Sequence, residues 1–348
     1  MREAFEIRPS ELLERVSAGH DLDEREADAL LASMAGGEMA PALAGALLIA
    51  LRVKGESAPE IRGFATAMRR LARRPSLPEG GRYVDVVGTG GDRSGSLNLS
   101  TGSALLAAAC GATVVKHGNR SVSSRCGSAD VLAALGLPIP LDERQAADCL
   151  AAHGFTFLFA PHYHPAMKHI APVRAALGVR TVFNILGPLS NPAAPPYHVI
   201  GAFSEPMAAL MAETLAGMGI ERAFVVHGAD GWDEATPVGP FVCFDVGPGG
   251  VERTVRDPRD YGLEPCRAED LKGGDAAENA ARLRDALAGG DCPGHRDALV
   301  LGAALALEVT GAAADAREGV ERAREAIRDG SAARLVDRLA GLGKQGAA

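Results

Sequence analysis

Two segments between residues 85 and 130 carry residue types that bind phosphate. The first, Gly88-Thr89-Gly90-Gly91-Asp92, follows a β-branched run that predicts a buried strand over residues 83–87. Its three glycines lack the Cβ atoms that would keep an anion away from the backbone, so consecutive N–H groups can converge on a phosphate. Ser100-Thr101 then stands where a helix is predicted to begin, and hydroxyls at a helix N-terminus favour a second anion.

The second segment is basic and rich in hydroxyls. A predicted strand over residues 113–115 leads into the loop KHGNRSVSS (residues 116–124), and another helix is expected from about Ser128. Two such loops after successive strands predict a site for a ligand with two separate phosphate groups. The spacing fits neither GxGxxG with its downstream acid nor GxxxxGK[ST], so both nucleotide motifs are excluded. A Gly-rich turn alone would be weak evidence, because many α/β proteins carry one for tight packing.

Acidic residues and histidines form two further groups. Asp233 and Glu234 are adjacent in a Gly-containing loop directly after a strand predicted over residues 223–226, and Trp232 is expected to pack beside them. Two neighbouring acids are, by themselves, typical of a solvated loop. His162, His164 and His169 invite a zinc hypothesis, but their spacing lacks the acid or fourth ligand of known zinc motifs, so no zinc is predicted.

Composition limits the class of protein. With 348 residues and 47% hydrophobic content, the chain can form one large core and a smaller domain. A net charge of −8 argues against general binding of nucleic acid or of an anionic membrane. The six cysteines contain no CxxC pair, which is typical of free thiols in a reducing cytosol. The N-terminus lacks the apolar region of a signal peptide and no apolar stretch could span a membrane, so we expect a soluble cytoplasmic protein.

The hydrophobic pattern predicts a helical segment followed by an α/β segment. Residues 1 to about 75 suggest four amphipathic helices, the first capped by Ser10 and the second opened by a capping box. The third helix, about residues 40–53, is apolar on nearly all sides, so it is buried centrally or pressed against a second subunit. From residue 83, short β-rich runs alternate with helical stretches, which predicts a parallel sheet flanked by helices. The predicted strands after the first two span residues 155–159, 199–203 and 223–226, with a hairpin over 241–246 and 251–255; a helix is predicted from Pro165, and the tail from 297 to 342 is mostly helical.

The motifs GTGGD, NLST, KHGNRSVSS and GSAD, in this order, are more specific than any spacing rule. With the stretches at residues 160–193 and 227–240, they make the chain resemble the anthranilate phosphoribosyltransferases. This tryptophan-pathway family transfers phosphoribosyl from phosphoribosyl pyrophosphate (PRPP) to the amine of anthranilate, giving N-(5-phosphoribosyl)anthranilate and pyrophosphate. The resemblance spans nearly the whole chain.

The resemblance implies an architecture and an assembly. A small helical domain, residues 1–78, is joined by helices from about 165–185. A large α/β PRPP-binding domain comprises residues 79–164 and 186–348, with a mainly parallel central sheet flanked by helices. The family is usually homodimeric through its helical domain.

The resemblance also implies site residues, carried over position by position. Mg²⁺ is the expected cofactor, with two ions per subunit. Arg93 and Leu97 replace a usual glycine and phenylalanine, which changes the shape of the first loop, and Ser96 replaces a threonine but keeps the hydroxyl. The implied PRPP contacts are Gly88, Gly91, Asp92, Ser96, Asn98, Leu99, Ser100, Thr101, Lys116, His117, Gly118, Asn119, Arg120, Ser121, Val122, Ser123, Ser124 and Ser128; the anthranilate contacts are Gly88, Asn119, Pro161, His164 and Arg174; the metal ligands are Ser100, Asp233 and Glu234.

Two rival functions remain open from the residues. A pyrimidine nucleoside phosphorylase has a similar fold and a Gly-rich loop, but it would show a different signature after the second strand. A non-catalytic nucleic-acid-binding relative should be basic and should lack the metal or amine-acceptor positions. KHGNRSVSS and the Asp233-Glu234 pair count against the phosphorylase. The acidic charge and the retained metal and amine-acceptor positions count against the nucleic-acid-binding relative.

Overall fold

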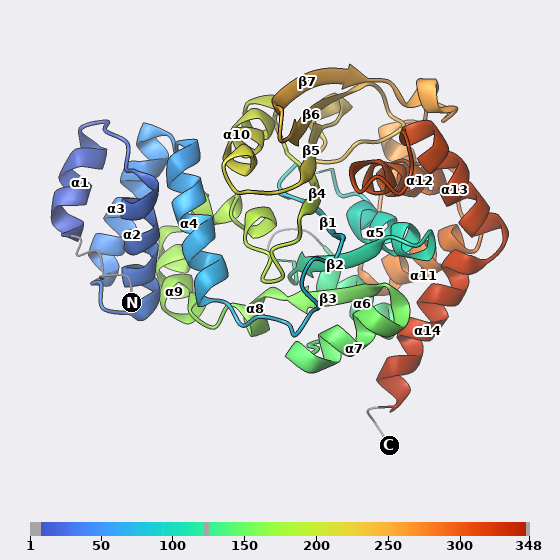
Figure 1. The fold of residues 1–348 in the computed structure, drawn as a ribbon, viewed down its shortest axis with the longest axis horizontal. Coiled ribbons are helices and arrows are strands. Elements are labelled where there is room, and N and C mark those ends of the chain that lie inside the picture. Colours follow the sequence, from blue (N-terminus) through green and yellow to red (C-terminus); the bar gives the residue numbers. More distant parts are fainter. Residues whose placement is uncertain (1–7, 93, 122–124, 346–348) are drawn as a thin grey trace.

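The computed structural model describes residues 8–92, 94–121 and 125–345. A helical lobe and a larger α/β lobe lie side by side in Figure 1. Four N-terminal helices form the helical lobe, and a helix from the middle of the chain packs against the second and third of them. The helices of this lobe are α1 (Pro9–Ser17), α2 (Glu24–Gly36), α3 (Pro41–Lys54), α4 (Ala58–Leu71) and α9 (Met167–Leu177).

The first two helices begin for different local reasons. At α2 the predicted capping box is present, because the Asp23 carboxylate accepts a hydrogen bond from the Glu26 N–H and the Glu26 carboxylate accepts one from the Asp23 N–H. The prediction that Ser10 caps α1 is wrong. The N-cap is Arg8, and Pro9 occupies the first helical position, where its fixed φ fits and its missing N–H costs nothing.

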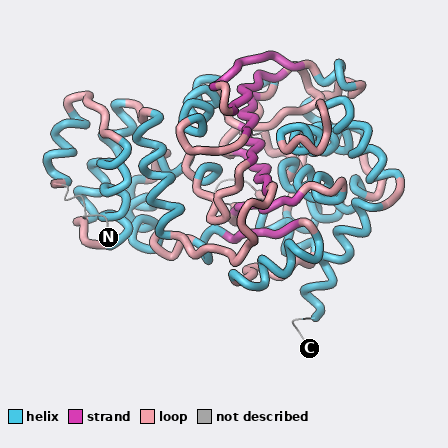
Figure 2. Tube along the Cα trace, viewed as in Figure 1, coloured by secondary structure: helices cyan, strands magenta, loops and turns pink. Residues whose placement is uncertain are grey.

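The α/β lobe contains a seven-stranded sheet in the order β3-β2-β1-β4-β5-β6-β7. The first five strands are parallel, and β6 and β7 form the predicted antiparallel hairpin. The strands run diagonally through the centre of the lobe in Figure 2, with helices on both sides. The bounds are β1 (Tyr83–Gly88), β2 (Thr113–Gly118), β3 (Phe155–Phe159), β4 (Tyr197–Gly201), β5 (Arg222–His227), β6 (Phe241–Gly247) and β7 (Gly250–Arg256).

The strand order reverses direction between β1 and β4. The chain proceeds from β1 outward to β2 and β3, then returns to the other side of β1 and continues through β4 and β5. At such a reversal the connections leave in opposite directions, which opens a crevice at the carboxyl ends of the strands. Gly88 and Gly201 are the last paired residues of the two strands, so they mark this crevice.

Most helices of the α/β lobe agree with the hydrophobic pattern. Strand β4 begins and ends two residues earlier than predicted, and a short helix α8 precedes α9. Helix α11 was not predicted, although its alanine and charged residues favour a helix. The helices are α5 (Leu99–Ala109), α6 (Ser128–Leu135), α7 (Glu143–His153), α8 (Ala160–Tyr163), α10 (Glu205–Ala216), α11 (Ala276–Leu287), α12 (Pro293–Val309), α13 (Ala316–Arg328) and α14 (Ser331–Gln345), with 3-10 turns at Val182–Asn184, Gly187–Leu189, Ala229–Gly231, Pro258–Tyr261 and Ala268–Leu271.

Two hydrophobic cores stabilise the molecule. One lies within the α/β lobe, between the sheet and helices such as α5 and α12. The other is shared between the lobes, since Leu47 and Phe64 of the helical lobe belong to the same buried cluster as Ile200 and Val225 of the sheet. The domain bounds predicted at residues 78, 164 and 186 stay a prediction, because the packing is continuous across them.

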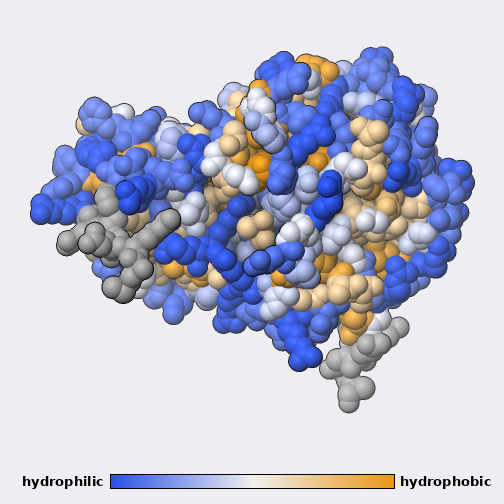
Figure 3. All heavy atoms as spheres, viewed as in Figure 1, coloured by the Kyte–Doolittle hydropathy of each residue, from blue (hydrophilic) through white to orange (hydrophobic). Residues whose placement is uncertain are grey.

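The surface is mixed. In Figure 3 hydrophilic residues dominate the outer edges of both lobes, and apolar residues appear between the lobes and over the middle of the α/β lobe. Among the described residues no helix combines the length and the apolar character that crossing a bilayer requires.

Candidate active site

Three loops meet at the carboxyl edge of the parallel strands. The Gly-rich loop (residues 88–98) follows β1, the basic loop (residues 116–128) begins within β2, and the acidic loop (residues 228–240) follows β5. The predicted shared site therefore has a physical basis, because β1, β2, β4 and β5 run parallel and all end at one edge. Helix α5 begins at Leu99 and adds its N-terminal N–H groups to this edge.

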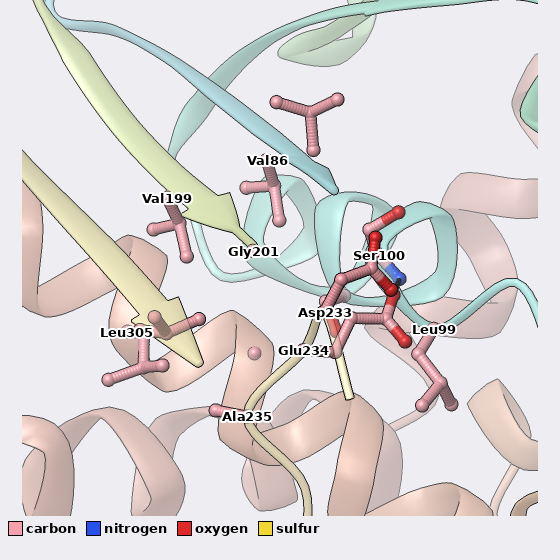
Figure 4. A pocket seen from close by; sticks show the side chains of 13 residues that line it. Val86, Leu99, Ser100, Val199, Gly201, Asp233, Glu234, Ala235 and Leu305 are labelled. Atoms are coloured by element: carbon pink, nitrogen blue, oxygen red, sulfur yellow. Dashed lines mark hydrogen bonds between the residues drawn. The ribbon is translucent and has the colours of Figure 1, made fainter. Parts of the chain in front are cut away.

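The acidic loop folds over the Gly-rich loop. The Asp233 carboxylate accepts a hydrogen bond from the Gly90 N–H, and the Glu234 Oε1 accepts one from the Ser100 N–H at 2.8 Å. The Asp233 N–H donates to Asp92 Oδ2 at 3.4 Å. Figure 4 shows the oxygens of Ser100, Asp233 and Glu234 gathered at one end of a cavity, so the implied metal ligands lie together.

Burial makes this group of acids unusual. Asp233 is 7% exposed. Burial, with the nearby Asp92 carboxylate, raises the pKa of Asp233 to about 8. Burial and the charges of Asp233 and Asp92 raise the pKa of Glu234 well above its ordinary value. Asp233 is buried, whereas Asp92 and Glu234 stay partly exposed to solvent. Three carboxyl groups that repel one another, with a serine hydroxyl beside them, form an oxygen donor set that suits a hard divalent cation such as Mg²⁺.

Glycine is required where the acidic loop crosses the two central strands. A Cβ atom added at Gly88 would lie 2.5 Å from Asp233 Oδ2, and one added at Gly201 would lie 1.6 Å from the Asp233 carbonyl oxygen. Neither position has room for a side chain. The two glycines therefore allow the acidic loop to descend into the crevice between β1 and β4.

A small cavity of about 30 Å³ lies beneath the acids. Val86 of β1, Val199 of β4 and Leu305 of α12 give it an apolar lining, and these side chains lie across from the acids in Figure 4. The apolar lining accounts for the desolvation of Asp233 and Glu234. The cavity is far too small for a sugar phosphate, so it supports the acids from below.

Lys116 connects the basic loop to the acids. Its side chain is 1% exposed, and its Nζ donates to the Val86 carbonyl and, at 3.4 Å, to Ser100 Oγ. Burial lowers the pKa of Lys116, while the charges of Asp85 and Glu234 oppose that shift. A buried ammonium beside a helix N-terminus adds positive charge where phosphate is expected.

Asp85, which the sequence interpretation missed, holds the basic loop from below. It is fully buried on β1 and accepts hydrogen bonds from the His117 N–H at 3.3 Å and from Asn191 Nδ2 at 2.8 Å. Burial raises its pKa to about 6, although the Lys116 charge opposes this. The sequence signal that could have identified Asp85 is an acidic residue within a run of β-branched residues that predicts a buried strand.

Asp130 closes the far end of the basic loop. Its carboxylate accepts hydrogen bonds from Arg120 Nη1 at 2.8 Å and from the N–H groups of Ser121 and Gly127 at 3.1 and 3.0 Å. Partial burial alone would raise its pKa, but these hydrogen bonds outweigh that effect and lower it. Asp130 ends the GSAD motif, yet it is not among the predicted site residues.

The residues implied for anthranilate come from four parts of the chain: the end of β1, the loop after β2, α8 with its C-cap, and α9. The rings of His117 and His164 meet edge to face with centroids 5.1 Å apart. Burial lowers the pKa of His117 to about 3 and that of His164 to about 4, so both rings are neutral at pH 7. Arg174 lies half-buried on α9 with its guanidinium 5.3 Å from the centre of the Phe183 ring, and Pro161 lies exposed on α8.

Arg180 forms an unpredicted link. It lies between α9 and the turn at Val182–Asn184, and its Nη2 donates to the Gly91 carbonyl at 3.0 Å. Its guanidinium also stacks 5.0 Å from the centre of the Phe203 ring. The segment after α9 therefore touches the Gly-rich loop directly.

Of the remaining predicted residues, Leu99 and Thr101 are buried in the first turn of α5. Ser96, Asn98, Asn119 and Ser128 lie on the two loops, and Ser128 Oγ donates to the Asn119 carbonyl at 3.3 Å. Trp232 is buried beside the acids as predicted. Arg93, Val122, Ser123 and Ser124 lie outside the described residues.

Comparison with known proteins identifies relatives of both lobes. The family description "Glycosyl transferase family, helical bundle domain" matches residues 10–72, and "Glycosyl transferase family, a/b domain" matches residues 80–333. An anthranilate phosphoribosyltransferase of Rubrobacter xylanophilus is 48% identical over 94% of this chain and 96% of its own length. One of Methylobacterium nodulans is 47% identical over the same shares of the two chains.

Solved structures give the same relatives. The crystal structure of anthranilate phosphoribosyltransferase from Thermus thermophilus is 43% identical, with a TM-score of 0.90 over 96% of this chain and 99% of that chain. The Saccharomyces cerevisiae enzyme in complex with PRPP and Mg is 25% identical, with a TM-score of 0.86 over 99% of this chain and all of that chain.

Proposed function

The chain belongs to the anthranilate phosphoribosyltransferase family, and from this premise we propose how its residues divide the work of the reaction. It is a phosphoribosyltransferase of tryptophan biosynthesis. It transfers phosphoribosyl from PRPP to the amine of anthranilate, with N-(5-phosphoribosyl)anthranilate and pyrophosphate as products. The C1–oxygen bond of PRPP breaks and its electron pair leaves with pyrophosphate, while the amine nitrogen forms the new bond to C1 and gives up one of its two protons.

We propose that Ser100, Asp233 and Glu234 hold Mg²⁺, with two ions per subunit. The crowded, desolvated carboxyl groups support this assignment, because a divalent cation would offset their mutual repulsion. The yeast relative was crystallised with PRPP and Mg. Bound Mg²⁺ would supply positive charge to the leaving pyrophosphate.

The Gly-rich and basic loops are proposed to bind the phosphates of PRPP. Exposed backbone at Gly90 and Gly91, the N-terminus of α5 and the buried ammonium of Lys116 converge on one edge of the sheet. Donors held in place before the reaction stabilise the charge that develops on the leaving oxygens without reorganising. The other PRPP contacts implied by the resemblance belong to this proposal.

Anthranilate is proposed to bind where the basic loop faces α8 and α9. Its amine is already neutral at pH 7, so the site needs a carboxylate partner and correct orientation more than a strong base. Arg174 is the proposed carboxylate partner, because guanidinium pairs well with a carboxylate. The neutral rings of His117 and His164 would line the approach, with Asn119, Gly88 and Pro161 as further contacts.

We propose two properties of the protein beyond the site. It is a homodimer through the helical lobe, supported by an apolar stripe on α3 that includes Val53, which is 81% exposed. It acts in the cytoplasm, supported by its six free cysteines. The nucleoside phosphorylase and nucleic-acid-binding alternatives are disfavoured, since the chain is acidic and shares 44–48% identity with anthranilate phosphoribosyltransferases.

The single observation that carries the site assignment is the contact of Asp233 and Glu234 with Gly90 and Ser100. The double variant Asp233→Asn/Glu234→Gln keeps the shape and removes the charge. We expect turnover to fall at least about 100-fold, measured as PRPP-dependent loss of anthranilate fluorescence with Mg²⁺ present. The double variant should also melt at a higher temperature in the absence of Mg²⁺, because the folded protein no longer buries two carboxyl groups that repel each other.

The matched control is Asp148→Asn/Glu252→Gln, which changes two exposed acidic residues in other elements. This control should retain wild-type turnover. If Asp233→Asn/Glu234→Gln keeps its activity and its dependence on Mg²⁺, the metal assignment is wrong.

A further inference from the structure

The segment from Leu271 to Asn279 docks against the Gly-rich loop, although it lies about 180 residues away in the sequence. The Leu97 N–H donates to the Leu271 carbonyl and the Gly273 N–H donates to the Gly95 carbonyl, each at 2.9 Å. The Lys272 ammonium also donates to the Ser94 carbonyl. The Gly-rich loop is thus held along one side by a short, strand-like pairing.

Gly273 shows how close this contact is. A Cβ atom at this position would lie 2.7 Å from the Ser96 carbonyl oxygen and 2.8 Å from the Leu97 nitrogen. Both neighbours are backbone atoms, so they cannot move aside as the end of a flexible side chain could. Only glycine fits where the two backbones meet.

A hydrogen-bonded chain of two asparagines then runs from this segment through both phosphate loops. Asn279 on α11 is 1% exposed, and its Oδ1 accepts from the Gly274 N–H at 2.6 Å. Its Nδ2 donates to Asn98 Oδ1 at 2.9 Å. Asn98 Nδ2 in turn donates to the Cys126 carbonyl in the basic loop at 3.2 Å. One buried side chain therefore connects the Gly-rich loop to the basic loop through Asn98.

We propose that Asn279 is a positioning residue for PRPP binding, which acts by holding Asn98 and, through it, both phosphate loops in their binding conformation. The inference rests on the proposed role of these loops in binding PRPP. Glycine-rich loops lose much conformational freedom when they order around a ligand, and a fixed support reduces that cost before the ligand arrives. The first and last links of the chain are bonds to backbone, so Asn279 is fixed at one end while it orients Asn98 at the other.

Asn279→Asp is the sharpest test because it changes one atom. The new carboxylate still accepts a hydrogen bond from the Gly274 N–H, but its second oxygen faces the side-chain oxygen Oδ1 of Asn98. If Asn98 turns its amide to compensate, its oxygen then faces the Cys126 carbonyl, so one link is lost in either arrangement. We expect the KM for PRPP to rise roughly tenfold, as the loss of one or two buried hydrogen bonds implies, with less than a twofold change in the KM for anthranilate.

Two further variants serve as a control and as a second test. Gln145→Glu makes the same amide-to-acid change in the capping box of α7, away from the loops, and should leave both KM values unchanged. Lys272→Ala removes an exposed tether of the same loop, so it should fold normally and raise the KM for PRPP roughly threefold.

The outcomes separate this inference from the proposed function. If the wild-type protein shows no saturable, PRPP-dependent loss of anthranilate fluorescence, the proposed function fails. If the wild type does so, but Asn279→Asp melts at a lower temperature with a KM for PRPP within twofold of wild type, Asn279 is merely structural and the inference is overturned. The inference is likewise overturned if Asn279→Asp does not fold and Lys272→Ala leaves the KM for PRPP unchanged.

Discussion

At the scale of single residues, the site combines charges that would not be stable there alone. Asp233 and Glu234 repel each other in a site lined by Val86 and Leu305, and Lys116 is the nearby buried cation. Burying a carboxylate without a full complement of partners costs free energy, so the protein holds these acids at the expense of its own stability. That cost is the expected consequence of a site shaped for a cation and a pyrophosphate.

The free-energy cost of burying these acids should make the stability of the protein depend on pH. Because the pKa of Asp233 is raised from its ordinary value to about 8, its carboxyl binds a proton more tightly in the folded state. The stability this contributes is full at acid pH and is lost as pH rises through 8. Without Mg²⁺, the gain in unfolding free energy from Asp233→Asn/Glu234→Gln should therefore be larger at pH 7.5 than at pH 5.5, by at least about 2–3 kcal/mol from Asp233 alone, and the raised pKa of Glu234 adds in the same direction.

Urea unfolding of the wild type and the double variant at both pH values measures this difference, and contributions from other groups cancel between the two proteins. A gap that is equal at the two pH values, or larger at pH 5.5, would show that the acids are not destabilised by burial. Saturating Mg²⁺ should reduce the gap, since only the wild type binds the ion at this site.

Arg174 carries a second prediction at this scale. Its guanidinium is half-buried against Phe183, and burial lowers its pKa, so the charge is already partly desolvated and suited to a carboxylate. Arg174→Ala should raise the KM for anthranilate at least about tenfold and that for PRPP less than threefold. Steady-state kinetics with each substrate varied will decide, and Lys168→Ala on the same helix is the control. An equal rise in both KM values would remove Arg174 from the amine site.

At the scale of elements, the reversal between β1 and β4 determines where the chemistry takes place. Loops from β1, β2 and β5 reach the same edge because the strands are parallel, and Gly88 and Gly201 leave room for the acidic loop between them. Helix α11 then adds the support that Asn279 provides. The conformation of each loop therefore depends on its neighbours as well as on its own sequence.

Helix α3 carries a prediction about assembly. Its exposed and half-buried apolar residues recur at Ala42, Ala46, Ile49 and Val53, a stripe along one side of the helix. If this stripe forms the proposed dimer contact, Val53→Glu should weaken the dimer at least about tenfold, because it would bury a charge. Sedimentation velocity across a dilution series measures this, with circular dichroism as a check on folding.

Val255→Glu is the matched control, since Val255 is an exposed valine on β7 of the other lobe. It should leave the sedimentation coefficient unchanged. A Val53→Glu protein that sediments as the wild type does would exclude this face of α3 from the interface.

At the scale of the whole molecule, the two lobes share a core. Phe64 from α4 is fully buried in the cluster that includes Ile200 of β4, and Arg69 of α4 donates to the Leu189 carbonyl at 2.8 Å. The two family matches divide the chain near residues 72–80, but the hydrophobic packing does not. We therefore expect the lobes to unfold together.

Phe64→Ala tests this expectation. Truncation of a fully buried phenylalanine should lower the unfolding free energy by about 3–5 kcal/mol. Differential scanning calorimetry should show one transition for the wild type and one, shifted downward, for the variant. Phe157→Ala in the other core should shift the same single transition. A separate, earlier transition confined to Phe64→Ala would mean that the helical lobe unfolds by itself.

The sequence predicted which loops would form the site, because residue type and local order are visible in the chain. Three glycines in four positions and hydroxyls at a helix start indicate phosphate binding by themselves, whereas the adjacent acids gained their proposed metal role only from the family resemblance. The hydrophobic period also predicted the four N-terminal helices and the strands, with small shifts such as that of β4. Helix α11 was not predicted.

Tertiary structure alone decided which distant groups support those loops. Asp85, Arg180 and Asn279 act on partners between 32 and 181 residues away, and no local pattern reveals such a pairing. It also decided the electrostatics, since the pKa of Asp233 depends on burial that exists only once α12 and the sheet have closed around it. Residue type is a property of the chain, whereas desolvation and long-range hydrogen bonds are properties of the folded arrangement.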